Sequence, residues 1–133
     1  MSRKTAREAA FKTIFEIPFH TKETPSDVIN FGTKYEEYKL DTQSDINYYI
    51  NVVSLCFENI DSIDEKISTF LRDWTIDRIS KVNLSILRLA ICEITYIDDI
   101  PFQVSINEAI ELAKEFSDDD APAFINGVLA SAV

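Results

Sequence analysis

Four cationic side chains and two aromatic rings near the start of the chain form the first group of residues that could do chemistry. The cations are Arg3, Lys4, Arg7 and Lys12, and the rings are Phe11 and Phe15. Cations bind phosphates and aromatic rings stack on bases, so this combination can bind single-stranded RNA. A plainer interpretation has solvated cations at a helix start and phenylalanines in the core, and the residue types alone favour it.

The acidic run Asp118–Asp120 could attract a divalent cation. It stands directly before Pro122, where a new helix is expected to begin. Carboxylates at that place satisfy free backbone N–H groups and oppose the positive end of the helix dipole. Capping is therefore favoured over metal binding, and we expect no metal site.

Cysteine and histidine usage also argues against a metal or a cofactor. His20 is the only histidine, and Cys56 and Cys92 do not form a paired motif, so a zinc site is not expected. Both cysteines fall within apolar helical stripes. Free core thiols in a reduced cytosol are favoured over a disulfide.

No residue pattern typical of an enzyme is present in the sequence. Glycine-rich phosphate loops, Ser/His/Asp sets and Cys/His pairs are absent, as is the Glu-x-x-His motif of di-metal bundles. We therefore expect a non-enzymatic protein without a cofactor.

Arg88 and Glu93 interrupt an apolar run from Ile86 to Ile94. Five residues apart on a helix, they are rotated by about 140° and need not face each other. We expect each of them to pair with another helix or to reach solvent. A role in binding a partner is the alternative.

The charge of the chain is distributed unevenly. The net charge is −10, with 13 basic and 23 acidic residues. The first twelve residues carry four cations and one acid, a net +3, which leaves −13 on the other 121 residues. A cationic end on an acidic body fits a small docking site for phosphates, or a solvated helix start.

Apolar residues recur at helical spacing along almost the whole chain, and no run alternates with period two. Capping boxes are predicted at Thr5 with Glu8, with Ser2 as an alternative and earlier start of that helix, and at Ser62 with Glu65. The 133 residues suit one domain, residues 1–133, which we predict to be a compact all-α bundle of six or seven helices. The expected helices span residues 5–17, 25–31, 44–60, 62–74, 79–97, 104–116 and 122–129, with 79–97 central and largely buried.

No apolar run approaches the roughly 20 residues that a membrane span needs, and the N-terminus has no apolar signal core. We therefore expect a cytoplasmic protein that does not bind membranes. Gly127 lies within an apolar helical stretch, where glycine costs about 1 kcal/mol against alanine. Close helix packing at Gly127 is the predicted reason for it.

Three stretches carry a resemblance to a known family. Residues 104–129 read VSINEAIELAKEFSDDDAPAFINGVL, residues 86–90 read ILRLA with Glu93 close behind, and residues 6–8 read ARE. In this order and at this spacing, they closely resemble the NusB family of bacterial transcription antitermination factors. The resemblance implies seven helices in two small bundles and no catalysed chemistry. It also implies pairing with NusE, a small-subunit ribosomal protein, and binding to single-stranded boxA RNA of ribosomal RNA operons. Contact with the transcribing RNA polymerase complex would be indirect.

The resemblance also assigns roles to residues. RNA-facing positions correspond to Arg3, Lys4, Arg7, Asp120 and Phe124. The partner face corresponds broadly to residues 76–93, including Ile76, Asn83, Arg88 and Glu93. Phe124 can either stack on a base or fill the core. The chain has fewer arginines at its start than the family pattern, and Ala123 stands where a basic residue can precede the phenylalanine.

Two alternatives to an RNA-binding antitermination factor stay open. One is a protein-only interaction module, in which the fold is kept but the reduced basic patch and the net charge of −10 leave no useful RNA affinity. The other is the N-terminal domain of a ribosomal RNA cytosine methyltransferase, which would require a further domain after Val133.

Overall fold

The structure is a computed structural model that describes residues 3–17, 40–71 and 75–132. Within these ranges the protein is all-helical, with six α-helices, one short 3-10 helix and no strand. The predicted helix over residues 25–31 lies outside the described residues. The elements are α1 (Arg3–Glu16), α3 (Gln43–Glu58), α4 (Ile60–Phe70), η2 (Ile76–Arg78), α5 (Lys81–Tyr96), α6 (Phe102–Phe116) and α7 (Ala121–Ala130).

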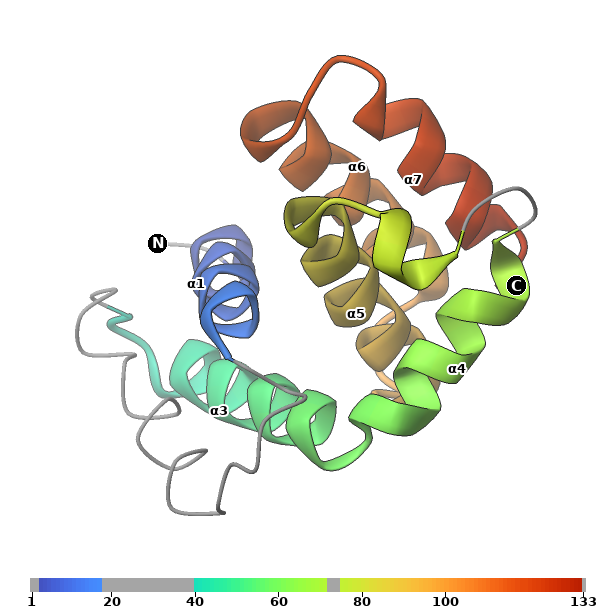
Figure 1. The fold of residues 1–133 in the computed structure, drawn as a ribbon. Helices are drawn as coiled ribbons and strands as arrows, with labels where there is room; N and C mark the ends of the chain where they lie inside the picture. The colour runs from blue at the N-terminus through green and yellow to red at the C-terminus, as the bar shows by residue number, and fades with distance from the viewer. Residues whose placement is uncertain (1–2, 18–39, 72–74, 133) are drawn as a thin grey trace.

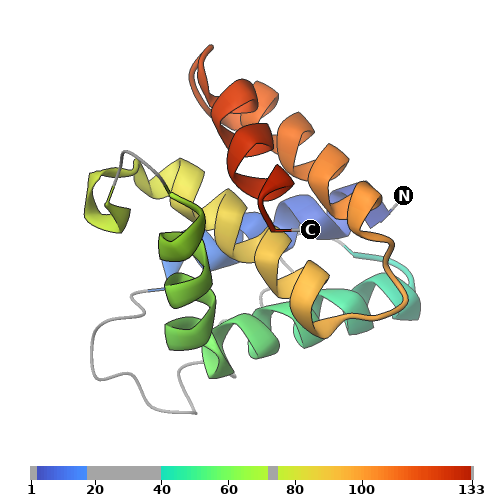
Figure 2. The same ribbon diagram turned by 90° about the vertical axis from the view of Figure 1, so that its right-hand side faces the viewer.

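Helix α5 lies at the centre of the fold and packs against α1, α3, α4, α6 and α7. Every residue from Ser85 to Glu93 is buried, which confirms the prediction of a central helix. Helices α1 and α3 pack together on one side of α5, and α6 and α7 pack together on another (Figures 1 and 2). Buried residues from all six helices form one hydrophobic core.

The two predicted capping boxes are wrong. Helix α1 already includes Arg3, so Thr5 is inside it, and Ser62 lies two residues inside α4. Side-chain caps occur instead at Thr42, which accepts a bond from the backbone N–H of Asp45 (3.2 Å), and at Ser80, which starts α5. These hydroxyls satisfy N–H groups that have no partner within the helix.

The start of α7 differs in one respect from its prediction. Pro122 lies in the first turn as expected, and Asp120 occupies the N-cap position. The Asp120 side chain makes no capping hydrogen bond, however, because the residue itself has helical backbone angles. Its carboxylate is exposed, next to the positive end of the α7 dipole.

Gly127 does not lie in a close helix contact, so that prediction is wrong. The residue is exposed, and a Cβ atom built on it would meet no heavy atom within 4 Å. The prediction rested on the apolar stretch of sequence around Gly127, but the buried residues of α7 are Ala121, Ile125, Val128 and Leu129.

Cys56 and Cys92 are free and buried, as predicted. Burial raises the pKa of the Cys56 thiol to about 12 and raises that of Cys92 as well. Both groups are therefore protonated and unreactive at neutral pH. None of the helices described here has the length and apolar character that crossing a membrane requires.

Candidate nucleic-acid interface

Arg7 and Glu93 form a forked ion pair in the interior. Arg7 Nε donates to Glu93 Oε2 at 2.8 Å and Arg7 Nη2 donates to Glu93 Oε1 at 3.2 Å. The residues are only 4% and 1% exposed. The third nitrogen, Arg7 Nη1, reaches Glu108 Oε1 of α6 at 3.5 Å. This pair ties the first helix to the central helix.

Two hydroxyl groups complete the shell around Glu93. Ser105 Oγ donates to Glu93 Oε1 at 2.8 Å, and the Tyr48 hydroxyl donates to Glu93 Oε2. Burial and the nearby charge of Glu93 raise the pKa of Tyr48 well above its ordinary value, so it stays a donor. Burial alone would lower the pKa of Arg7, but the hydrogen bond and charge of Glu93 raise it overall. Side chains from α1, α3, α5 and α6 thus meet in one satisfied polar cluster.

The resemblance implies RNA binding for Arg7 and partner binding for Glu93, and the structure shows both side chains paired with each other in the interior. A guanidinium that is buried and committed to Glu93 is not presented to a phosphate in solution, and Glu93 is not presented to a partner protein. The expectation that Glu93 pairs with another helix is confirmed. Arg7 and Glu93 therefore fix the position of α1, the helix that carries the remaining cations.

Arg88 is likewise held inside the fold. Its Nε and Nη2 donate to the two carboxylate oxygens of Asp64 on α4, at 2.8 and 2.7 Å. The expected pairing of Arg88 with another helix is confirmed. At 6% exposure, Arg88 also supports the predicted partner face from within and does not lie on its surface.

Arg3 lies at the surface near the start of α1. Its Nε donates to Asp45 Oδ1 at 3.0 Å and its Nη2 donates to Ser44 Oγ at 2.9 Å. The guanidinium also lies 4.7 Å from the centre of the Tyr48 ring. The side chain is 39% exposed, so Arg3 is oriented by these contacts and still accessible to a ligand.

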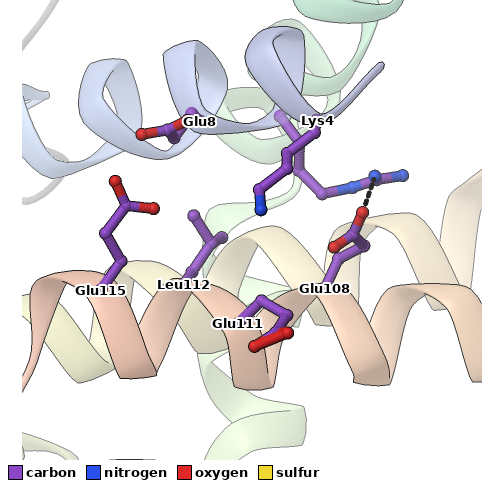
Figure 3. Close-up of a pocket in the computed structure, with 7 residues that line it drawn as sticks. Lys4, Glu8, Glu108, Glu111, Leu112 and Glu115 are labelled. Carbon is purple, nitrogen blue, oxygen red and sulfur yellow. Dashed lines mark hydrogen bonds and ion pairs between the residues drawn. The ribbon is translucent and has the colours of Figure 1, made fainter. Parts of the chain in front are cut away.

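Lys4 is exposed on the neighbouring face of α1, beside a cleft lined mainly by acidic side chains. Figure 3 shows Lys4 extending from α1 toward α6, where Glu108, Glu111 and Glu115 line the other wall. Burial and the charge of Glu115 raise the pKa of Glu8, which also lines this cleft. The field around Lys4 is therefore less positive than the sequence of α1 alone suggests.

Two further lysines, Lys12 of α1 and Lys81 of α5, each lie beside an aromatic ring. Lys12 Nζ is 5.3 Å from the centre of the Phe116 ring at the end of α6, and Lys81 Nζ is 4.6 Å from that of Phe15. Both lysines are exposed. Lys12 is one of the four cations that the sequence already groups at the start of the chain, eight residues after Lys4. The position of Lys81 beside Phe15 could not be predicted from the sequence, because it depends on how α1 and α5 pack together.

The second predicted RNA position is a hollow of about 340 Å³ beside the start of α7. Asp120 and Phe124 line it together with Asn83 of the predicted partner face, and Arg78 adds an exposed cation that sequence reasoning missed. Asn83 Oδ1 accepts from Ser117 Oγ at 2.7 Å, which fixes one wall.

Phe124 is half-buried: it packs against the core and also lines this hollow. Ile76, from the same predicted partner face as Asn83, is half-buried in η2 and packs against the core. Across the described ranges, no group of three or more histidine, cysteine or acidic side chains is arranged to hold a metal ion.

Comparisons with known proteins agree on one family. The model of the NusB family matches residues 4–133. The transcription antitermination protein NusB of Natranaerobius thermophilus is 49% identical over 132 residues, covering 97% of this chain and 92% of the relative. The corresponding protein of Acetivibrio thermocellus is 44% identical over 133 residues, covering 100% of this chain and 89% of its own.

Solved structures give the same result. A NusB structure from T. maritima has a TM-score of 0.82 at 32% identity and covers 98% of this chain and 89% of its own. A crystal structure of the antitermination factors NusB and NusE in complex with dsRNA has a TM-score of 0.82 at 27% identity, with 97% and 93% coverage. These matches support an antitermination protein over the methyltransferase alternative.

Proposed function

The chain belongs to the NusB family, and from this premise we propose that it binds single-stranded boxA RNA together with NusE as a transcription antitermination protein. As a member of that family, it is a non-enzymatic protein. The proposal treats residues 1–133 as one NusB-like domain acting in the cytoplasm, where nascent RNA is made, with the RNA polymerase complex contacted indirectly.

The observation that carries the proposal is a line of exposed cations and aromatic rings that links the two predicted RNA positions. It begins at Arg3 and Lys4 and continues to Lys12, which lies over the Phe116 ring. The next residue, Ser117, bonds to Asn83 in the wall of the hollow that holds Phe124. Cations contact phosphates, and the accessible faces of the half-buried Phe116 and Phe124 rings can stack on bases, so this line fits a strand with unpaired bases.

The proposed NusE surface uses the accessible part of residues 76–93. Ile76 and Asn83 are only partly buried and can contribute contacts. Arg88 and Glu93 act indirectly, because their ion pairs with Asp64 and Arg7 hold α5 against its neighbours. The solved complex of NusB and NusE with dsRNA supports joint binding of NusE and RNA.

Filter binding with boxA RNA, with and without NusE, tests the proposal. We expect charge reversal at Arg3 and Lys4 to weaken RNA binding while NusE binding survives. Lys114→Glu, at an exposed site on α6 where the side chain makes a surface ion pair with Glu111, is a control charge reversal outside the proposed path and should have little effect. Failure of both mixtures to bind boxA RNA better than a scrambled RNA at low salt would overturn RNA recognition.

The protein-only alternative keeps one specific observation in its favour. The cleft between α1 and α6 is lined by Glu8, Glu108, Glu111 and Glu115, which repel phosphates near Lys4. Normal NusE binding without any gain in RNA affinity is the result that alternative expects. The same filter-binding assay therefore distinguishes the two functions.

A further inference from the structure

Arg3 also lines one end of a groove whose other lining residues lie outside the line of cations described above. The groove lies between the start of α1, the exposed face of α3 and the turn from α5 to α6, with a volume of about 590 Å³. Apart from Arg3, none of its lining residues belongs to the proposed boxA path or to the proposed NusE surface.

Three carboxamide side chains line this groove at four-residue spacing on α3. Gln43, Asn47 and Asn51 are all exposed, and they share one helical face. Gln43 Nε2 donates to Asn47 Oδ1 at 2.8 Å, which orients both amides. That bond uses one donor and one acceptor, so both side chains keep further hydrogen-bonding capacity.

A carboxamide presents a donor and an acceptor side by side, and this pair matches the edge of an adenine base. Ile97 and Ile100 supply apolar surface in the same groove, against which a base or ribose can pack. The exposed carboxylate of Asp99 repels phosphates but accepts hydrogen bonds from base amino groups. The groove is thus suited to bases more than to phosphates.

Arg3 supplies the place for a phosphate at one end of the groove. Two of its guanidinium nitrogens are used by Asp45 and Ser44, and the third retains its donors. Because Arg3 also begins the line of cations along α1, a single RNA strand can continue from one surface to the other at this residue.

We propose that the groove between α3 and the α5–α6 turn binds a short run of unpaired, adenine-containing nucleotides that flank the RNA segment held along α1. The inference rests on the proposed RNA-binding function and extends it. Arg3 contacts the phosphate at the junction, while Asn47 and Asn51 contact base edges.

The test compares three RNAs in fluorescence anisotropy titrations against the complex of the full chain with NusE. One RNA carries only the boxA segment, the second adds four adenosines at each end, and the third replaces those adenosines with abasic nucleotides. The abasic RNA keeps the added phosphates and removes the bases. We expect the adenosine-flanked RNA to bind about five- to tenfold more tightly than the abasic one.

Two double variants test whether the tighter binding of the adenosine-flanked RNA depends on the groove. Asn47→Ala combined with Asn51→Ala should reduce the ratio between adenosine-flanked and abasic RNA to about one, leaving the affinity of the unflanked RNA unchanged. Alanine is favourable on an exposed helical face, so α3 should remain folded. The control pair Ser62→Ala and Ser68→Ala removes two exposed polar groups from α4 and should keep the full ratio.

Each other outcome overturns the inference in a recognisable way. Equal binding of adenosine-flanked and abasic RNA, or a gain that survives the double asparagine variant, removes the groove from RNA recognition and leaves the proposed function intact. Loss of NusE affinity in that variant identifies a protein-binding surface instead. Absence of binding to the unflanked RNA overturns the proposed function itself.

Discussion

Arg7 in α1 and Glu93 in α5 are joined by two hydrogen bonds, 2.8 and 3.2 Å long, although they lie 86 residues apart in the sequence. The pair is buried, and Tyr48 and Ser105 complete the hydrogen bonding of the carboxylate. A buried ion pair gains little net free energy, because desolvation offsets the attraction, but losing one partner strands a charge in the interior. The pair therefore acts by fixing where α1 lies.

Glu93→Ala should lower the free energy of unfolding by about 3–5 kcal/mol, since it leaves the Arg7 guanidinium buried without its main partner. Urea denaturation followed by circular dichroism measures this change. Glu65→Ala, at an exposed position on α4, is the control and should change stability by less than about 0.5 kcal/mol. The double variant Arg7→Leu with Glu93→Leu should recover part of the loss, because no unpaired charge remains. A cost below about 1 kcal/mol for Glu93→Ala would contradict the proposed role.

The salt dependence of RNA binding should separate Arg7 from Lys4. Lys4→Ala removes a proposed phosphate contact, so the slope of log affinity against log salt should become shallower by about 0.7. Arg7→Met keeps much of the side-chain volume and removes no phosphate contact, so the slope should stay unchanged even where affinity falls. Binding is measured at several salt concentrations with variants shown to be folded. A shallower slope for Arg7→Met would show that Arg7 does contact an RNA phosphate.

The sequence contains enough to predict the helices but not which polar residues meet. Periodicity shows that Arg7 and Glu93 each interrupt an apolar stripe, and it gives the face on which each lies. Their pairing depends on how α1 crosses α5, which no local pattern encodes. The resemblance grouped Arg7 with Arg3 and Lys4 because all three are cations at the start of one helix. Burial separates them, and burial is a property of the fold.

The wrong capping box at Ser62 and the wrong role of Gly127 have related causes. Ser62 and Glu65 fit the capping pattern, yet Asn59 is the only residue between α3 and α4, so the helix starts before the pattern does. Gly127 falls within an apolar stretch of sequence, but its direction around α7 points to solvent. In both cases the local pattern is compatible with several positions, and packing selects one of them.

Gly127→Ala should raise the free energy of unfolding by up to about 1 kcal/mol. Alanine lowers the backbone entropy of the unfolded chain, and the new methyl group meets no neighbour in the fold. Thermal denaturation measures the change as an increase in Tm. Ala123→Gly, the reverse change at an exposed site on the same helix, should lower Tm. A decrease in Tm for Gly127→Ala would contradict the open space around this position.

Glu8→Gln should strengthen RNA binding at neutral pH and weaken its dependence on pH. Burial and Glu115 raise the pKa of Glu8, so the folded protein takes up this proton at a higher pH than the unfolded chain does. Stability contributed by Glu8 therefore increases as the pH falls through the folded pKa toward the ordinary value, and decreases as the pH rises again. Protonation also removes a negative charge beside Lys4, so RNA affinity should rise over the same pH range.

Anisotropy titrations from neutral to mildly acidic pH measure this change in RNA affinity, with Glu65→Gln on α4 as the control. An identical pH profile for Glu8→Gln and the unchanged protein would rule out this contribution.

Phe124 should contribute to RNA binding and to stability through different faces of its ring. The ring packs against the core and also lines the hollow beside the start of α7. Phe124→Leu retains an apolar side chain, so it should cost less than about 1.5 kcal/mol in the free energy of unfolding. It removes the aromatic face, and since stacking on one base is worth about 1–3 kcal/mol, RNA affinity should fall about fivefold or more. Denaturation and anisotropy titrations on the same preparation measure the two effects.

Phe116→Leu is the control, because it replaces another half-buried ring that packs against the core. It should lower RNA affinity less than Phe124→Leu does, because Lys12 lies over the Phe116 ring. If Phe124→Leu kept full RNA affinity, the Phe124 ring would be a core residue only, and the hollow would not hold a stacked base.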